Sequence, residues 1–349
     1  MRSPLARGLS LPWGGLMALR RRASHAGWLA SAGVAIPVVS VGNLSLGGTG
    51  KSPLIRSLAR ALLQGVPHEL SPLLPALGLP VAILSRGYGR ASRGWRLVSR
   101  GEGPLLEVEE AGDEPLMLAR QLPGAWVAVC EDRRAGARRL VELGAGGILL
   151  DDGYQHLALR RDLDLLLWDC QVDPARECVL PFGRLRENPA AALDAGVLLF
   201  GRPSPRLLAA RLDWFRGLFR QAGRPFPPAF AVESSLAGLT DPATGRPHSP
   251  AGLGRHGLFC GIAAPERFLE QAERLLGAPA WSRCWGDHHD FTEADLETLR
   301  RAVREQRLGR LVTTWKDAVR LPAQHGLPLL VAEQELRIQA ADLYLQRHE

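Results

Sequence analysis

A glycine-rich turn followed by Lys-Ser constrains the fold of this chain more than any other stretch. An apolar run at residues 38–41 leads into the turn, and apolar residues recur at helical spacing over residues 54–62. A strand, a glycine-rich turn, Lys-Ser and a helix are together typical of a phosphate-binding loop, whose backbone N–H groups and helix N-terminus attract phosphate oxygens. The common pattern has a glycine five residues before the Gly-Lys pair, and this chain has Ser45 there. We therefore predict a variant loop; a tight strand-to-helix turn without a ligand is the alternative.

The lysine and the serine of this turn have distinct expected roles. Lys51 is placed to reach the outer phosphates of a nucleotide, and the Ser52 hydroxyl to face a magnesium ion. Only two of the 43 basic residues are lysines, Lys51 and Lys316. Because the chain otherwise uses arginine, we expect a lysine where a compact charge serves better than a planar group. Lys316 therefore becomes a second candidate for a functional residue.

The overall composition narrows the class of protein. At 349 residues the chain is long enough for two domains with a sizeable core. Its five cysteines are an odd number without CxxC spacing, which favours reduced thiols in a cytosolic setting over a disulfide framework or a zinc site. The formal charge of +7 indicates an anionic partner. Since nucleotide bias also explains a high arginine content, we expect no nucleic-acid partner.

Residues 1–36 form a segment apart from the rest, with an apolar part followed by three arginines. Pro12 and two glycines interrupt the apolar part, which falls short of the roughly 20 apolar residues of a transmembrane helix. The arginines follow the apolar part, which is the wrong order for a signal peptide. An amphipathic segment on a membrane surface, with arginines near anionic headgroups, is one interpretation. An ordinary helix packed on its own domain is the other.

Short apolar stretches alternate with helical patterns along most of the chain. This alternation predicts an α/β fold, a P-loop-type parallel sheet with helices on both faces, whose ligand site lies beyond the carboxyl ends of the strands. Residues 222–252 are rich in Pro, Gly and Ser, which favours a domain boundary. We predict a P-loop domain at 37–232 and a smaller α/β domain at 233–349 that closes over the site. The expected strands are 81–84, 126–130, 148–150, 163–168, 197–200, 258–262, 311–313 and 329–331, with a hairpin at 95–108.

Acidic residues at the ends of predicted elements are candidates for chemistry. Asp151 and Asp152 follow an apolar strand, where P-loop enzymes place the acid that helps to bind magnesium. Asp-Asp-Gly is equally compatible with a plain turn. Asp113 begins a helical pattern, either as an N-cap or as a carboxylate that takes a proton from an attacking hydroxyl. From the residues alone the cap is favoured for Asp113.

Two stretches of the second predicted domain carry further candidates. Residues 285–291 concentrate two histidines and two acids before a helix, and a His288 held by a carboxylate suits proton handling. Surface histidines that cap the next helix are the alternative. No second His/Cys cluster in the sequence completes a metal site. Lys316 follows a strand and either faces the cleft or pairs with Asp317 at a helix start.

Eight motifs, in order across nearly the whole chain, resemble the tetraacyldisaccharide 4′-kinase family of lipid A biosynthesis. No single motif is decisive, but the set is specific. The motifs are residues 42–44 with 47–53, 85–89, 112–115, 151–156, 180–187, 261–268, 287–289 and 313–318. Two departures are Trp315, where the family usually shows Glu, and a long irregular excursion at 65–80.

The resemblance implies a kinase that transfers the γ-phosphate of ATP to the 4′-hydroxyl of a tetraacyldisaccharide 1-phosphate, a lipid A disaccharide precursor, and so forms lipid IVA. It implies a place at the cytoplasmic face of the bacterial inner membrane, peripheral or held by the N-terminal segment. The matching positions that it implies for ATP are Gly47, Gly48, Thr49, Gly50, Lys51 and Ser52.

The resemblance also implies roles for individual acids and bases. Asp113 and His288 match the pair that activates the hydroxyl, and Lys51 completes the catalytic set. Asp151 and Asp152, together with Ser52, match the Mg²⁺ side of the site; which of the two acids contacts the ion stays open. Glu187 and Arg133 fall in family motifs with less defined roles.

Two rival functions come from other classes. The first is a nucleotide-switch ATPase with a deviant phosphate loop that acts on a protein partner, in which the Asp-His-His stretch has no obvious place. The second is a non-catalytic protein that binds lipid or nucleic acid through its basic face. An intact Gly50-Lys51-Ser52 with matching acids downstream speaks against the second.

Overall fold

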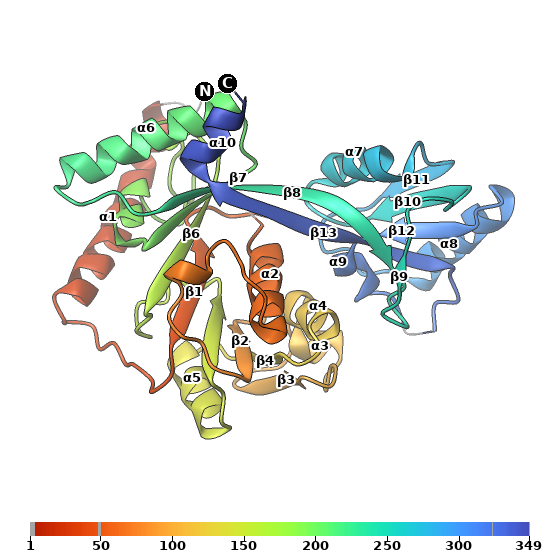
Figure 1. Cartoon of the computed structure of the whole chain (residues 1–349), viewed down its shortest axis with the longest axis horizontal. Helices are drawn as coiled ribbons and strands as arrows, with labels where there is room; N and C mark the ends of the chain where they lie inside the picture. Colours follow the sequence, from red (N-terminus) through yellow and green to blue (C-terminus); the bar gives the residue numbers. More distant parts are fainter. Residues whose placement is uncertain (1–3, 48–49, 323, 349) are drawn as a thin grey trace.

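The chain folds into two lobes joined by a pair of long strands. A computed structural model describes residues 4–47, 50–322 and 324–348. In Figure 1 the first lobe, which holds β1 to β7, lies on the left, and the second lobe, which holds β10 to β12, lies on the right. Strands β8 and β13 run from one lobe to the other.

The first lobe is built on a mostly parallel sheet. Its strand order is β3-β4-β2-β5-β1-β6-β7, and neighbouring strands are parallel except β3 and β4. Every residue of β1 (Val38–Asn43) is buried, as expected for a parallel strand covered on both faces. The predicted α/β fold with a parallel sheet is confirmed. The other strands are β2 (Val81–Ser85), β3 (Arg96–Arg100), β4 (Trp126–Val129), β5 (Gly147–Asp151), β6 (Leu163–Asp169) and β7 (Val197–Gly201).

Helices cover both faces of this sheet. Val39 and Val41 pack with α2 (Lys51–Gln64) and α4 (Asp113–Gln121) in one apolar cluster, whereas Val38 packs with α5 (Arg133–Glu142) in another. This division follows from the pleat, since successive residues of a strand point to opposite faces. On the same face as α5, α6 (Pro205–Gln221) covers β6 and β7. Shorter elements are α3 (Val108–Ala111), η1 (Ser71–Leu73) and η2 (Pro189–Asp194).

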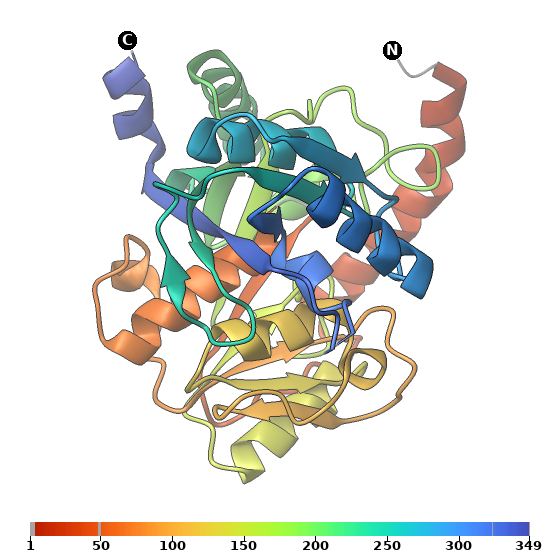
Figure 2. The same ribbon diagram turned by 90° about the vertical axis from the view of Figure 1, so that its right-hand side faces the viewer.

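The second lobe has its own parallel strands and helices. The strands are β10 (His256–Cys260), β11 (Trp281–Cys284) and β12 (Arg310–Thr313), with β10 in the middle. The helices are α7 (Pro265–Leu276), α8 (Glu293–Glu305) and α9 (Trp315–Ala318). Helix α8 begins with a capping box between Thr292 and Asp295, which satisfies its first free N–H groups. Figure 2 shows this lobe from the front, with the two chain ends at opposite sides behind it.

The two lobes share one continuous sheet. Strands β8 (Ala229–Thr240) and β13 (Leu329–Ala340) pair antiparallel along most of their length, while β8 pairs with β7 and β13 with β12. The short β9 (Pro247–His248) adds to the end of β8. Helix α10 (Ala341–His348) returns to the first lobe, where Asp342 pairs with Arg216 of α6 at 2.8 Å. The boundary predicted at 232/233 falls within β8, and the division into domains stays a prediction.

The glycine-rich turn connects β1 to α2, as the sequence predicted. Strand β1 ends at Asn43 and α2 begins at Lys51, preceded by Gly50 with a left-handed φ of 95°. Gly42 lies against Tyr154, because a Cβ at this glycine would be 2.5 Å from the tyrosine Cβ. Two of the residues predicted to bind the nucleotide, Gly48 and Thr49, lie outside the described residues.

Two stretches differ from the expectation or add to it. Residues 96–100 form the first strand of the predicted hairpin, and the chain returns beside it, where the N–H of Leu105 donates to Val98 at 2.7 Å. The second strand, predicted at 105–108, was wrong, because residues 105–107 form no strand and α3 begins at Val108. Glu109 and Glu110 in the first turn favour a helix there, because acids stabilise a helix N-terminus. The excursion at 65–80 contains only the 3-10 turn η1 within the described residues.

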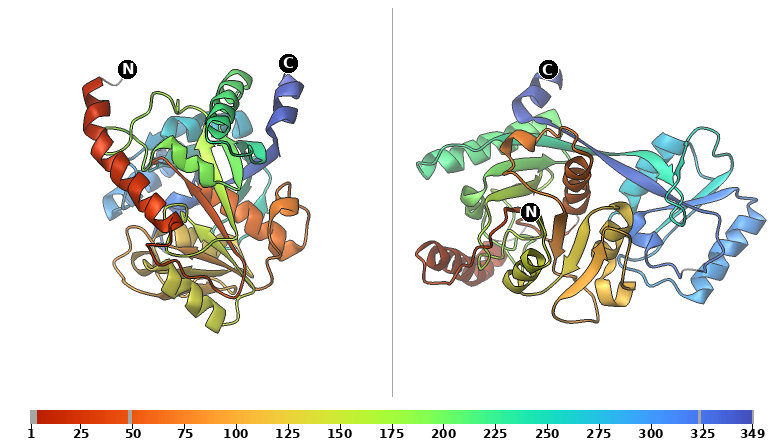
Figure 3. Two further views of the ribbon diagram at one scale, coloured as in Figure 1. Left: turned by 90° about the vertical axis from the view of Figure 1, so that its left-hand side faces the viewer. Right: turned by 60° about the horizontal axis from the view of Figure 1, so that its bottom comes forward.

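The N-terminal segment forms α1 (Pro4–His25), which lies along the outside of the first lobe, away from α10 (Figure 3). One of its faces is packed: Arg21 forms two hydrogen bonds with Glu187, at 2.9 and 3.0 Å, and a third of 2.7 Å with Asp194. Another face leaves Leu16 and Leu19 more than half exposed. Within the described part of the chain, no helix is long and apolar enough to cross a membrane. The packed face agrees with a helix on its own domain, and the interpretation as a membrane-surface segment stays a prediction.

Replacement of Arg21 is expected to loosen α1. Burial alone would lower the pKa of Arg21, but the hydrogen bonds and charge of Glu187 raise it above its ordinary value. Arg21→Ala therefore leaves Glu187 as a buried carboxylate without its cation, which costs about 3–5 kcal/mol when a buried pair is broken. We expect a loss of this order in urea unfolding, with faster proteolysis after residue 25. Arg22→Ala, which changes an exposed neighbour, is the control; equal losses in both variants would contradict the assigned role of the pair.

Candidate active site

Several charged side chains meet near the carboxyl ends of β1, β2 and β5, beside the start of α2. Lys51, the first residue of α2, points its Nζ at Oδ1 of Asn43 at 3.1 Å and at Oδ1 of Asp152 at 3.4 Å. Arg186 contacts the other oxygen of Asp152 at 2.6 Å. Burial would raise the pKa of Asp152, but Lys51 and Arg186 hold it below its ordinary value. Asp152 is thus an ionised acid beside the loop lysine.

Asp151, at the end of β5, is the more deeply buried acid. Ser85 at the end of β2 donates a hydrogen bond of 3.0 Å to its Oδ2. Its Oδ1 is buried and has no hydrogen-bond partner among the described residues. Burial, then the charges of Glu114 and Asp152, raise the pKa of Asp151 to about 7. One oxygen of the Asp151 carboxylate therefore lacks a hydrogen-bond donor among the described residues, and it lies close to two other acids.

Glu114 links this group of charges to the second lobe. Lys316, in α9, contacts Oε1 of Glu114 at 2.8 Å. Burial would raise the pKa of Glu114, yet Lys316 and then Lys51 lower it below its ordinary value. Lys316 was expected either to face the cleft or to pair with Asp317, and in the structure it reaches across to Glu114 of the first lobe. Asp317 instead receives hydrogen bonds from its own segment and from the N–H of Gly261.

Asp113 and His288, which are 175 positions apart in the sequence, meet across the lobes. Nδ1 of His288 lies 2.9 Å from Oδ2 of Asp113. The helix cap is not made by Asp113: the N-cap of α4 is Gly112, and the Asp113 carboxylate points at the second lobe. His288 has a left-handed φ of 57°, a conformation uncommon outside glycine, and its N–H donates to Gly261. The loop backbone thus holds the ring against Asp113.

Arg320 completes this contact and was not singled out by sequence reasoning. Its Nε donates to Oδ2 of Asp113 at 2.7 Å, and its Nη2 lies 2.7 Å from the same oxygen. Its side chain is 3 % exposed. Arg320 is one of 41 arginines and follows Asp317 by three positions, so no local pattern distinguished it.

The other candidates lie at the margin of the site. His289 stacks on Trp285 and contacts Asp295 at 3.0 Å, so it belongs to the start of α8. Arg133 is buried at the start of α5, and burial lowers its pKa; its Nη1 donates to two backbone carbonyls. Trp315, where the family usually has Glu, is buried and donates from its indole N–H to Glu333 of β13 at 2.8 Å.

Five of the predicted residues, together with Glu114 and Arg320, thus form two adjoining groups. The strand-end cluster consists of Lys51, Asp151, Asp152 and Glu114, and the Asp113 cluster consists of Asp113, His288 and Arg320. Glu114 follows Asp113 directly, so the start of α4 belongs to both. Ser52 is buried as the second residue of α2. Within the described residues, no group of three or more His, Cys, Asp or Glu has the arrangement of a ready-made metal site.

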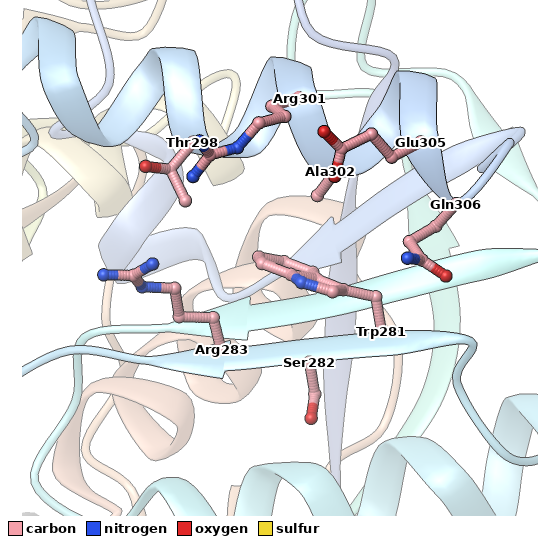
Figure 4. Close-up of a pocket in the computed structure, with 8 residues that line it drawn as sticks. All are labelled: Trp281, Ser282, Arg283, Thr298, Arg301, Ala302, Glu305 and Gln306. Carbon is pink, nitrogen blue, oxygen red and sulfur yellow. The ribbon is translucent and has the colours of Figure 1, made fainter.

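A separate hollow of about 500 Å³ lies between β11 and α8. Figure 4 shows Trp281 and Arg283 rising from β11 toward Arg301, which extends from α8. The hollow contains none of the residues predicted from the sequence, so it does not belong to the site described above.

Comparison with known proteins gives consistent results over nearly the whole chain. Residues 3–347 match the family described as Tetraacyldisaccharide-1-P 4′-kinase. A tetraacyldisaccharide 4′-kinase of Anaeromyxobacter dehalogenans strain 2CP-C is 38% identical over 348 residues, covering 96% of this chain and 85% of that protein. The enzyme of the same name from Chlorobaculum parvum is 33% identical over 344 residues, covering 95% and 88%.

A solved structure is similar to the whole fold. It is a crystal structure of LpxK from Aquifex aeolicus in complex with ATP, with a TM-score of 0.73 and 26% sequence identity. The similarity covers 97% of this chain and 96% of that one. The two-lobed arrangement is thus shared over its full length.

Proposed function

The chain belongs to the tetraacyldisaccharide-1-P 4′-kinase family, and from this premise we infer that it transfers the γ-phosphate of ATP to the 4′-hydroxyl of a tetraacyldisaccharide 1-phosphate. The product is the doubly phosphorylated precursor of lipid A. The observation that carries this function is the contact between Asp113 and His288. It places a carboxylate and a histidine beside Glu114, whose pKa, despite burial, is lowered by Lys316 and then by Lys51 of the proposed phosphate-binding loop. A nucleotide-switch ATPase has no use for that contact.

We assign ATP binding to the turn between β1 and α2. The backbone of Gly47 and of residues 50–52 would supply N–H groups to the phosphates, and the N-terminus of α2 would add a partial positive charge. In the structure Lys51 pairs with Asp152 at 3.4 Å. When ATP binds, Lys51 would leave this carboxylate and contact the outer phosphates instead. The LpxK of Aquifex aeolicus, which shares the fold, was crystallised with ATP.

The strand-end cluster also fits Mg²⁺. Mg²⁺ prefers oxygen ligands, and Oδ1 of Asp151 has no hydrogen-bond partner among the described residues. The charges of Glu114 and Asp152 act on the same carboxylate, so a bound cation would stabilise all three acids. Ser52, Asp151 and Asp152 are the residues that would hold it. When bound, it neutralises negative charge on the outer phosphates.

We assign proton removal from the acceptor to Asp113, supported by His288. Phosphoryl transfer depends mostly on positioning and charge neutralisation, and a hydroxyl acceptor gains from a base within hydrogen-bond reach. As the acceptor oxygen bonds to the γ-phosphorus, its proton passes to the Asp113 carboxylate and the bond to ADP breaks. The predicted smaller domain, residues 233–349, supplies His288 by closing over the larger one.

We place the protein at the cytoplasmic face of the inner membrane through α1. Leu16 and Leu19 are exposed, and so is the indole of Trp28, just after the helix. Arg20 and Arg22 are exposed as well, so one segment presents both apolar and cationic groups. Such a surface suits an anionic lipid leaflet and an acceptor embedded in it.

The direct test of the function is a phosphorylation assay. Purified protein is incubated with ATP, Mg²⁺ and the tetraacyldisaccharide 1-phosphate in detergent micelles, and the lipid product is analysed by mass spectrometry. We expect a product heavier by one phosphate. A rate of ATP hydrolysis that does not respond to the lipid, with no phosphorylated lipid, would refute the assignment.

Variants at the contact between the lobes test the assigned base. Asp113→Ala and His288→Ala are expected to lower kcat by about 10²–10⁴-fold, the usual contribution of general base catalysis, with ATP affinity nearly unchanged. The matched control is His289→Ala, which removes a neighbouring histidine that contacts Asp295 instead. Losses of the same size in kcat and in ATP affinity would mean that Asp113 and His288 are structural.

A third experiment examines the metal. Binding of a non-hydrolysable ATP analogue is measured by calorimetry with Mg²⁺ and with EDTA. We expect Mg²⁺ to tighten binding in the unaltered protein, and Asp151→Asn to remove most of this gain because a ligand oxygen is lost. Asp241→Asn, in an exposed turn, is the control. An undiminished Mg²⁺ effect in Asp151→Asn would exclude Asp151 as a ligand.

A further inference from the structure

We propose that Arg320 is a positioning residue for the base: it occupies Oδ2 of Asp113 and so leaves Oδ1 as the atom that takes the acceptor's proton. This inference rests on the proposed kinase function and adds a residue and an atom to it. It begins from the unequal surroundings of the two oxygens of Asp113.

Oxygen Oδ2 receives every polar contact that the structure gives this carboxylate within the described residues. Arg320 approaches it with Nε and Nη2, each at 2.7 Å, and His288 with Nδ1 at 2.9 Å. Hydrogen bonds between charged groups are stronger than neutral ones, so these donors fix the oxygen firmly. The Asp113 side chain keeps 18% of its surface exposed, and Oδ1 is the oxygen left for a ligand.

Arg320 is itself held from several sides. Its Nη1 donates to the carbonyl of Gly261 at 3.3 Å and lies 3.7 Å from Asp317. The backbone N–H of Arg320 donates to Asp317 as well. A guanidinium has five N–H donors in a rigid plane, so contacts on one edge fix the direction of the other. Arg320 thus transmits the geometry of the second lobe to Asp113.

The same guanidinium also limits the ring of His288. Nη2 lies 3.1 Å from Nδ1 of His288. Because an ionised carboxylate oxygen only accepts, the contact of Nδ1 with Oδ2 of Asp113 at 2.9 Å assigns a proton to Nδ1, and the guanidinium N–H then has no acceptor on the ring. Both therefore converge on the shared acceptor, Oδ2 of Asp113. In the proposed reaction the O–H bond of the acceptor breaks and its proton moves to Oδ1 of Asp113. The electron pair of the acceptor oxygen forms the bond to the γ-phosphorus, and the bond between this phosphorus and ADP breaks.

The test compares Arg320→Met and Arg320→Lys with the unaltered protein in the lipid phosphorylation assay. Arg320→Met should lower kcat by about 10–100-fold, because a misplaced base loses much of its effect, while KM for ATP and for the lipid stays within about threefold. Arg320→Lys keeps one charge for Oδ2 and should recover at least part of the loss. Arg161→Met is the matched control, since the Arg161 side chain is only 9% exposed and also pairs with an acid, Asp164, at 2.9 Å.

A double-mutant cycle separates positioning from a general structural effect. In an Asp113→Asn background, Arg320→Met should lower kcat by no more than about threefold, because the base through which Arg320 acts is already lost. A full additive loss would overturn the proposal, and so would a kcat of Arg320→Met equal to that of Arg161→Met.

Urea unfolding provides a readout that does not depend on activity. If the contact exists, Asp113→Asn should shift the unfolding midpoint less in the Arg320→Met background than in the unaltered protein. Equal shifts would show that the two side chains do not interact and would overturn the proposal. If the unaltered protein lacks kinase activity, the proposed function fails, and the role of Arg320 fails with it even where the midpoints couple.

Discussion

The structure depends on the contact between two acids at the start of α4 and three cationic or basic side chains of the second lobe. Asp113 meets His288 and Arg320, and the next residue, Glu114, meets Lys316. Arg320 is almost fully removed from water and needs its acidic partner, whereas His288 and Lys316 are partly exposed. A change in the angle between the lobes would therefore disturb Asp113, Glu114 and Arg320 together.

The two acids at the end of β5, Asp151 and Asp152, differ in how many positive charges they contact. Asp152 has two cations and a lowered pKa, whereas Asp151 has one hydroxyl donor and a raised pKa. Burial is the largest cause of the raised pKa of Asp151, and the charges of Glu114 and Asp152 add to it, whereas Lys51 and Arg186 both reach Asp152 and outweigh its burial. The proposed Mg²⁺ would supply the cation that Asp151 lacks, and the proposed nucleotide phosphates would draw Lys51 away from Asp152.

Much of the fold could be predicted from the sequence, because it rests on local patterns. The loop from β1 to α2 and the buried strands of the first lobe follow from glycines, Lys-Ser and β-branched runs. The contact of Asp113 with His288 was expected only from resemblance, since the residues alone favoured a helix cap. Arg320 carried no signal, because its role depends on where a distant lobe comes to lie. For Glu187 the motif was visible, but its partner Arg21 lies on α1, 166 positions earlier in the chain.

The two lysines of the chain, which composition alone singled out, lie near the same acid in the structure. Lys51 lies at the phosphate loop and Lys316 comes from the second lobe, yet both lower the pKa of the same acid, Glu114. A lysine offers a compact charge on a flexible stem, and an arginine offers a fixed planar fork. The proposed roles agree with this difference: Lys51 would turn from Asp152 to a phosphate, which a flexible stem allows, whereas Arg320 would keep the Asp113 carboxylate in one direction, which a planar fork held on several sides allows.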